Sequence, residues 1–140
     1  MSVPPDALCY LATPYSKYAA GIDRAFIDAA KLAALLLRAG LKVYSPIAHT
    51  HPLAIHGKLD PFDHSTWLPF DHAMMKACDV LLVAHMDGWQ ESHGIAEEIK
   101  YFAAAGKPIF DLDPQTLVMA KRKRVKPERE RYEGSPTEAA

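Results

Sequence analysis

The chain has 140 residues, of which 49% are hydrophobic and 24% are charged, a balance typical of one globular domain. Its formal net charge of −1 makes long nucleic acid a poor candidate partner, because such binding depends on a strongly basic surface. No apolar run approaches the ~20 residues that span a bilayer, and no signal peptide is visible at the N-terminus. The sequence holds only Cys9 and Cys78, which predicts no disulfide framework, and we expect a cytoplasmic protein without membrane contact.

The first part of the chain predicts a strand, a helix and a second strand. Residues 7–13 are apolar and rich in strand formers until Pro14 breaks the run. Apolar residues then recur at helical spacing over 21–39, and Gly40 stands where a C-terminal cap belongs. Residues 41–45 predict the next short strand.

The second part begins with an irregular stretch. Residues 47–68 hold several histidines and prolines, and we interpret them as a long loop of the kind that often carries function. A helix is predicted over 69–77, because it opens with a proline, which suits a first helical position. Residues 79–84, which form a continuous apolar run after Asp79, predict a buried parallel strand. A helix over 94–105 and a strand over 108–112 follow.

This alternation predicts a three-layer α/β/α fold, flavodoxin- or Rossmann-like, with a parallel sheet of four to five strands. In such folds ligands bind outside the carboxyl ends of the strands, where the strand order reverses. We assign residues 1–114 to this domain. Residues 115–140 contain the basic run at 121–124 and several glutamates, and they predict a polar, charged C-terminal extension.

Glu98 is the most informative single residue. It lies inside the apolar stripe that Ile95, Ile99 and Phe102 form on the predicted helix, whereas its neighbour Glu97 falls on the other face. An inward carboxylate costs several kcal/mol unless it is neutralised or hydrogen-bonded. The pattern therefore indicates either a catalytic carboxylate or a satisfied structural one.

Asp71 and Tyr10 are expected to join Glu98. We place Asp71 in the first turn of its helix, and helix N-termini gather at the carboxyl edge of a parallel sheet, where the first strand also ends. Two carboxylates there can divide the work of nucleophile and proton carrier, although Asp71 could equally cap its helix. The hydroxyl of Tyr10 can orient a carboxylate or serve only as the polar tip of a buried ring.

Substrate-binding residues are predicted in the surrounding loops. A serine hydroxyl beside free helix N–H groups is a natural seat for phosphate, although Ser92 could simply cap its helix. The predicted binding residues are Ser92, His93 and Gly94 before the helix, Thr13 and Tyr15 after the first strand, Trp89 in the loop at 87–93, and His49.

The histidines raise the alternative of a metal-dependent hydrolase. Several histidines and aspartates lie close in sequence over 49–72, but none forms a tight signature such as His-Glu-x-x-His, and we predict no metal. Phosphate-loop, dinucleotide-binding and serine-elbow motifs are also missing, which disfavours a kinase, a dehydrogenase and a serine hydrolase. No cofactor is predicted.

Three segments carry a family resemblance. They are Tyr10-Leu-Ala-Thr-Pro-Tyr15, Asp71 with Asp79, and Ser92-x-Gly94-x-x-x-Glu98 followed by Gly106-Lys107. Together they resemble the nucleoside 2-deoxyribosyltransferase-like superfamily, which includes the 2′-deoxynucleoside 5′-phosphate N-hydrolases. The resemblance covers residues 7–112 and is closest to short bacterial and phage members.

The resemblance implies roles for the central residues. Glu98 would attack the anomeric carbon, Asp71 would handle the departing base, and Tyr10 would orient the nucleophile. Serine at position 92 leans toward a 5′-monophosphate substrate, but the loop after the first strand lacks the glycine-rich arginine pattern of the phosphate-preferring hydrolases. Relatives complete their sites with a neighbouring subunit, so a homodimer or larger assembly is implied.

The resulting hypothesis is cleavage of the N-glycosidic bond of a nucleoside or nucleoside 5′-monophosphate through a covalent glycosyl–Glu98 intermediate. The acceptor is water or a second base. A non-catalytic nucleotide-binding module is the main alternative, because a fold does not determine a function.

Overall fold

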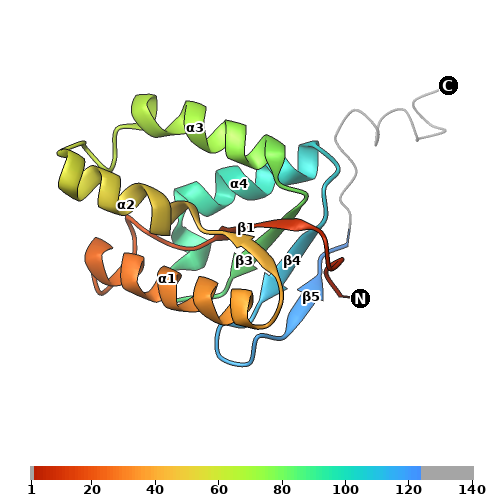
Figure 1. Cartoon of the computed structure of the whole chain (residues 1–140). Coiled ribbons are helices and arrows are strands. Elements are labelled where there is room, and N and C mark those ends of the chain that lie inside the picture. The colour runs from red at the N-terminus through yellow and green to blue at the C-terminus, as the bar shows by residue number, and fades with distance from the viewer. Residues whose placement is uncertain (1, 124–140) are drawn as a thin grey trace, which may run out of the picture.

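The computed structural model of the chain describes residues 2–123 (Figure 1). One five-stranded sheet has the order β2-β1-β3-β4-β5, in which β1 to β4 are parallel and β5 is antiparallel to β4. The strands are β1 (Leu8–Ala12), β2 (Lys42–Tyr44), β3 (Val80–Ala84), β4 (Ile109–Leu112) and β5 (Met119–Lys121).

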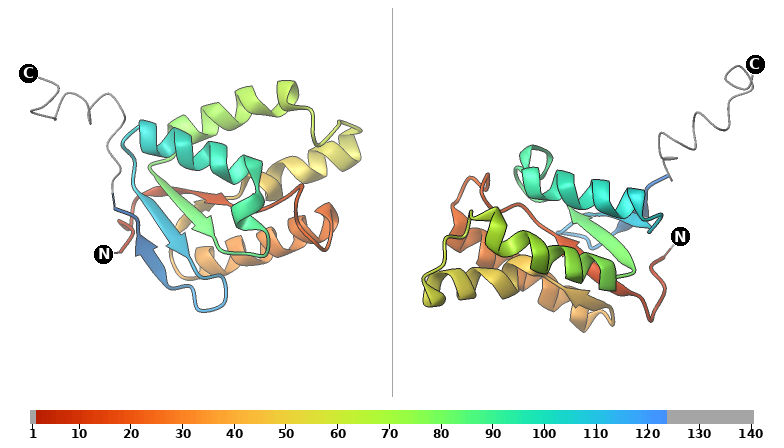
Figure 2. Two further views of the ribbon diagram at one scale, coloured as in Figure 1. Left: turned by 180° about the vertical axis from the view of Figure 1, so that it is seen from behind. Right: turned by 90° about the horizontal axis from the view of Figure 1, so that it is seen from above.

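Helices cover both faces of this sheet, which confirms the predicted three-layer α/β/α, Rossmann-like fold. Figures 1 and 2 show α1 on one face, α3 and α4 on the other, and α2 between α1 and α3. The helices are α1 (Ile22–Arg38), α2 (Pro46–Gly57), α3 (His64–Ala77) and α4 (His93–Ala104), with a short 3₁₀ turn, η1 (Trp89–Glu91), before α4. No helix within residues 2–123 is long and apolar enough to cross a membrane.

The fold extends past residue 114, where we predicted the domain to end. Strand β5 pairs with β4 through the register Asp111↔Ala120, and Arg122, directly after β5, makes a two-pronged ion pair with Asp111 of β4. The antiparallel edge strand therefore uses part of the stretch that we assigned to a charged extension. The rest of that prediction, at 124–140, lies outside the described residues.

The predicted helix over 21–39 is confirmed as α1. Its buried face is lined by small and branched apolar residues, which bring the helix close to the sheet. The helix ends at Arg38, and Gly40 follows with a positive φ of 96°, which suits glycine. Leu41 N–H donates to the Leu36 carbonyl across this turn, as in a Schellman motif.

The prediction of an irregular loop at 47–68 is wrong, because most of these residues are helical. Ser45 caps α2 by accepting a hydrogen bond from Ala48 N–H, and Pro46 occupies the first turn, where its missing N–H costs nothing. The helix tolerates Pro52 in its interior. Proline inside a helix removes a backbone hydrogen bond, so the local pattern favoured a loop over this helix.

The start of α3 is also corrected. Asp63 caps the helix by accepting hydrogen bonds from Ser65 and Thr66, so α3 begins five residues before Pro69, which lies in its interior. Asp71 consequently lies in the middle of α3 rather than in its first turn. A helix-capping role for Asp71 is thereby removed.

The strand order places a switch point between β1 and β3. The connection from β1 runs through α1 on one face of the sheet, whereas the connection from β3 runs through α4 on the other. Ligands of doubly wound sheets bind outside the carboxyl ends of the strands at such a point. The loops that follow the two strands touch there: a Cβ at Gly88, where φ is 82°, would lie 3.1 Å from the Lys17 carbonyl oxygen.

Candidate functional site

Tyr10 lies on β1 and faces the α3 and α4 side of the sheet. Because side chains alternate along a strand, Cys9 and Leu11 point into the opposite, α1 side. The Tyr10 ring is fully buried between Tyr44 and Phe102, with ring centroids 5.7 and 5.8 Å away. Desolvation, followed by the charges of Glu98 and Asp71, raises the pKa of its hydroxyl far above the usual range, so Tyr10 stays neutral.

Glu98 faces the same space from α4. Ile95 and Phe102 on its helix are buried, whereas Glu97 is exposed, as the apolar stripe predicted. The pKa of the Glu98 carboxyl is raised to about 8: desolvation has the largest effect, the Tyr10 hydroxyl opposes it, and the charge of Asp71 adds to it. The contact between Tyr10 and Glu98 is close enough to affect this pKa but does not meet strict hydrogen-bond geometry.

Asp71 supplies the second carboxyl from α3. Desolvation raises the pKa of this group to about 6, against a smaller opposing effect of His72. Its Oδ1 atom is buried and has no hydrogen-bond partner. The structure therefore brings Asp71, Glu98 and Tyr10 together, although Asp71 arrives from the middle of a helix and not from its end.

Tyr44, at the end of β2, is a member of this group that sequence reasoning missed. Its hydroxyl is buried without a hydrogen-bond partner, and desolvation, Asp71, Cys78 and Glu98 all raise its pKa. The available signal was its position as a polar aromatic residue at the carboxyl end of a strand. We call Tyr10, Tyr44, Asp71 and Glu98 the carboxyl–tyrosine cluster.

The predicted binding residues before α4 lie at its N-terminus. Ser92 is buried and caps α4 by accepting a hydrogen bond from Ile95 N–H at 3.2 Å, so its helix-capping role is realised. Gly94 follows in the first turn, where an added Cβ would lie 3.9 Å from the Ser92 hydroxyl oxygen. His93 is exposed and lies 4.0 Å from Glu97 and 6.2 Å, between ring centroids, from His64.

The remaining predicted binding residues, His49, Thr13, Trp89 and Tyr15, have separate surroundings. His49 on α2 stands between the rings of Tyr44 and Phe70, at 6.3 and 5.3 Å, and so borders the cluster. Thr13, directly after β1, is buried and its hydroxyl has no partner.

Trp89 lies apart from these residues. It stacks on His85 with centroids 4.1 Å apart, and His85 is bonded in turn to Asp111. Tyr15, in the loop after β1, is hydrogen-bonded to His51 on α2.

Two residues of the sequence motifs have structural roles. Lys107 donates three hydrogen bonds, of 2.7 to 3.0 Å, to the carbonyls of Met75, Lys76 and Cys78, where α3 ends. The Asp79 carboxylate accepts a 2.9 Å hydrogen bond from Leu8 N–H at the start of β1. These contacts fix the helix and strand that carry Asp71 and Tyr10.

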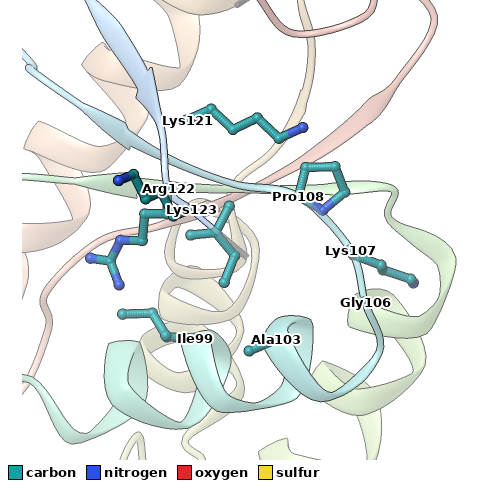
Figure 3. A pocket seen from close by; sticks show the side chains of 9 residues that line it. Ile99, Ala103, Gly106, Lys107, Pro108, Lys121, Arg122 and Lys123 are labelled. Carbon is teal, nitrogen blue, oxygen red and sulfur yellow. The ribbon is translucent and has the colours of Figure 1, made fainter. Parts of the chain in front are cut away.

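Two cavities in the described part of the chain lie away from the cluster. One, of about 170 Å³, is lined by Ile99 and Ala103 of α4 on one side and by Lys121 and Arg122 on the other (Figure 3). The other, of about 320 Å³, is lined by α1 residues, among them Asp28 and Lys31, and by the loop after β3. Within residues 2–123 no three His, Cys, Asp or Glu side chains gather as metal ligands.

The chain matches a model of a protein family. A family model described as "Domain of unknown function (DUF1937)" matches residues 7–113, which span the sheet from before β1 to just after β4 and all four α-helices. No curated protein matches the chain. The chain therefore belongs to the DUF1937 family.

Proposed function

We propose that this member of the DUF1937 family cleaves the N-glycosidic bond of a nucleoside or nucleoside 5′-monophosphate, by hydrolysis or by transfer to a second base. The observation that carries the proposal is the carboxyl–tyrosine cluster. Two carboxyls with raised pKa values and two neutral tyrosine hydroxyls share one desolvated space, and three of the four side chains keep a buried polar atom without a partner. Natural proteins rarely leave such atoms unsatisfied, which favours a ligand that supplies the missing bonds.

The proposed chemistry uses the two carboxyls in sequence. The ionised Glu98 attacks the anomeric carbon, the bond from that carbon to the base nitrogen breaks, and protonated Asp71 gives its proton to the base. Water or a second base then attacks the same carbon, the bond to Glu98 breaks, and the proton of the attacking group passes to Asp71. Tyr10 contacts Glu98 and holds the carboxyl in position.

The pKa values set the condition for this chemistry. With the pKa of Glu98 at about 8 and that of Asp71 at about 6, the first proton leaves Asp71, so the reactive form is a minor one. Its population is greatest between these two values, because both groups titrate as a pair. We therefore expect a bell-shaped pH dependence with a maximum near neutrality.

A non-catalytic nucleotide-binding function is the second candidate. The specific observation in its favour is the pKa of Glu98, because a carboxyl that stays protonated at neutral pH can donate a hydrogen bond to a nucleobase. In this case the cluster binds and does not react.

The deciding experiment is free-base release, measured by chromatography, from a panel of nucleosides and 5′-monophosphates. Wild type is compared with Glu98→Gln and with Glu97→Gln, which removes the exposed neighbouring charge and serves as the matched control. Release by wild type and Glu97→Gln, but not by folded Glu98→Gln, supports the glycosidase. Undiminished release by Glu98→Gln overturns it, and tight binding without release by wild type supports the binding module.

We also propose that the protein forms a homodimer or larger assembly. Six large apolar side chains of α2, α3 and their connection are between 38% and 49% exposed: Leu53, Ile55, Leu59, Phe62, Leu68 and Phe70. Exposed apolar groups of this kind are typical of protein contacts. Sedimentation velocity should give a dimer or larger species for wild type and a smaller one for Ile55→Lys; a wild-type monomer at high concentration contradicts the proposal.

A further inference from the structure

A buried histidine joins three segments near the switch point. His51 on α2 is 5% exposed, its Nδ1 lies 2.6 Å from the Tyr15 hydroxyl oxygen, and its Nε2 lies 3.1 Å from Asp23 Oδ1. The imidazole stacks on Phe26 of α1 and meets the Tyr15 ring edge-on, with centroids 4.9 and 5.6 Å away. We call Asp23, His51 and Tyr15 the histidine relay.

The order of protons in the relay follows from the chemistry of its ends. The Asp23 carboxylate can only accept a hydrogen bond, so Nε2 of His51 carries the hydrogen that faces it. In the neutral ring Nδ1 is then the acceptor, and the Tyr15 hydroxyl must donate to it. The single proton of Tyr15 is thereby used, and its oxygen keeps only lone pairs for any further contact.

Tyr15 also stays neutral in this setting. Desolvation, followed by the charge of Asp23, raises the pKa of its hydroxyl to about 12. Tyr15 is therefore neither a base nor a nucleophile near neutral pH. It is a fixed hydrogen-bond acceptor.

The position of Tyr15 connects the relay to ligand binding. It stands three residues beyond Ala12, the last residue of β1, at the carboxyl end where a doubly wound sheet binds its ligand. The N-terminus of α4, the helix that carries Glu98, lies at the same edge of the sheet.

We propose that Asp23 and His51 are positioning residues that hold the Tyr15 hydroxyl as an acceptor, and that Tyr15 selects ligands with a neutral hydrogen-bond donor at this position. This inference rests on the proposed function for the ligand class, a nucleoside or its 5′-monophosphate. The donor is then either an exocyclic amino group of the base or a hydroxyl of the sugar, and both chemistries satisfy the same oxygen.

The first part of the test needs no turnover. Nitrogen-15 shifts of the His51 ring, measured by NMR on the full chain near neutral pH, should show a protonated Nε2 and an unprotonated Nδ1. Asp23→Asn should disturb this state, because an amide can also donate. A protonated Nδ1 in wild type overturns the proposal, since Tyr15 would then be free to donate.

The second part measures selection. Adenosine and cytidine are compared with analogues that lack the amino group and with their 2′-deoxy and 5′-deoxy counterparts. The readouts are KM and kcat for base release, or dissociation constants if no base is released. For one class of analogue, the KM or dissociation constant of wild type should rise about 3- to 10-fold, the effect of losing one neutral hydrogen bond. Tyr15→Phe should erase that difference.

Control variants separate positioning from packing. The amide oxygen of His51→Asn can accept the Tyr15 proton where Nδ1 stood, so it should keep most of the discrimination that His51→Phe loses. Tyr18→Phe removes another tyrosine of the same loop, one that donates to Asp28, and should change nothing. If Tyr15→Phe discriminates between the analogues as wild type does, the inference is overturned. If wild type binds selectively but releases no base, only the proposed function is overturned.

Discussion

The two faces of the sheet are built from the same strands but differ in chemistry. On the α1 side, Cys9 and Leu11 of β1 pack with apolar residues of α1 and of the neighbouring strands. On the α3 and α4 side, Tyr10 meets Tyr44 and two carboxyls with raised pKa values. Apolar packing on the α1 face stabilises the fold, whereas the other face buries polar atoms without partners, which lowers stability.

A second contrast separates polar groups that are paired from those that are not. Asp111 accepts hydrogen bonds from both His85 and Arg122, and these bonds help to hold its pKa below the usual value, although partial burial raises it. Asp71, by contrast, has a buried oxygen without a partner and a raised pKa. Unpaired polar groups, more than polar groups in general, mark the candidate site.

The largest expected effect is on the reactive face, at the proton donor. Asp71→Asn should lower base release on the order of 10²-fold, the usual contribution of a positioned acid. The loss of activity on the alkaline side of the pH profile should also disappear, because that limb reports loss of the last proton of the carboxyl pair, whereas the variant needs only an ionised Glu98. Persistence of the alkaline limb in the variant would instead assign the acid role to Glu98.

The next largest effect is on the apolar face. Leu11→Ala removes a fully buried side chain and should lower the free energy of unfolding by roughly 3 kcal/mol, through lost burial and the cavity left behind. Denaturant unfolding measures this change. The shape of the pH profile for base release should stay that of wild type, and a shifted profile would show that the two faces are not independent.

A smaller effect concerns stability and pH. The pKa of Glu98 rises from 4.5 to about 8 on folding, so the folded state holds a proton that the unfolded state releases between these values. The favourable contribution is complete below about pH 4.5 and is lost as the pH rises through 8. Wild type should therefore lose roughly 1–3 kcal/mol more than Glu98→Gln over this interval in urea titrations. Parallel curves for the two proteins would contradict the raised pKa.

The smallest effect is expected at Tyr10. Its hydroxyl lowers the pKa of Glu98, so Tyr10→Phe should raise that pKa and move the optimum for base release to higher pH. Activity at pH 7 should fall about tenfold, since a smaller fraction of Glu98 is ionised. An optimum that stays in place would show that the hydroxyl does not act on Glu98.

Local sequence patterns determined much of the fold and part of the site. Apolar runs predicted the four parallel strands, the helical repeat and Gly40 predicted α1, and the stripe of Ile95 and Phe102 predicted that Glu98 faces inward. These signals are strong because each element must bury one face, and its period is written in consecutive residues. The family resemblance added roles for Glu98 and Asp71, which remain predictions.

Only the tertiary structure decided the rest. Helix α2 keeps Pro52 in its interior and forms where the local pattern favoured a loop, and α3 begins before Pro69, so Asp71 enters the site from mid-helix. Two contacts could be seen only in the folded chain, because their partners are far apart in sequence. Tyr44 is 34 residues from Tyr10, and His51 is 36 residues from Tyr15. The raised pKa of Glu98 also depends on tertiary structure, because it comes from the groups that pack around the carboxyl and exclude water. The sequence pattern predicted that Glu98 faces inward, but not which groups surround it.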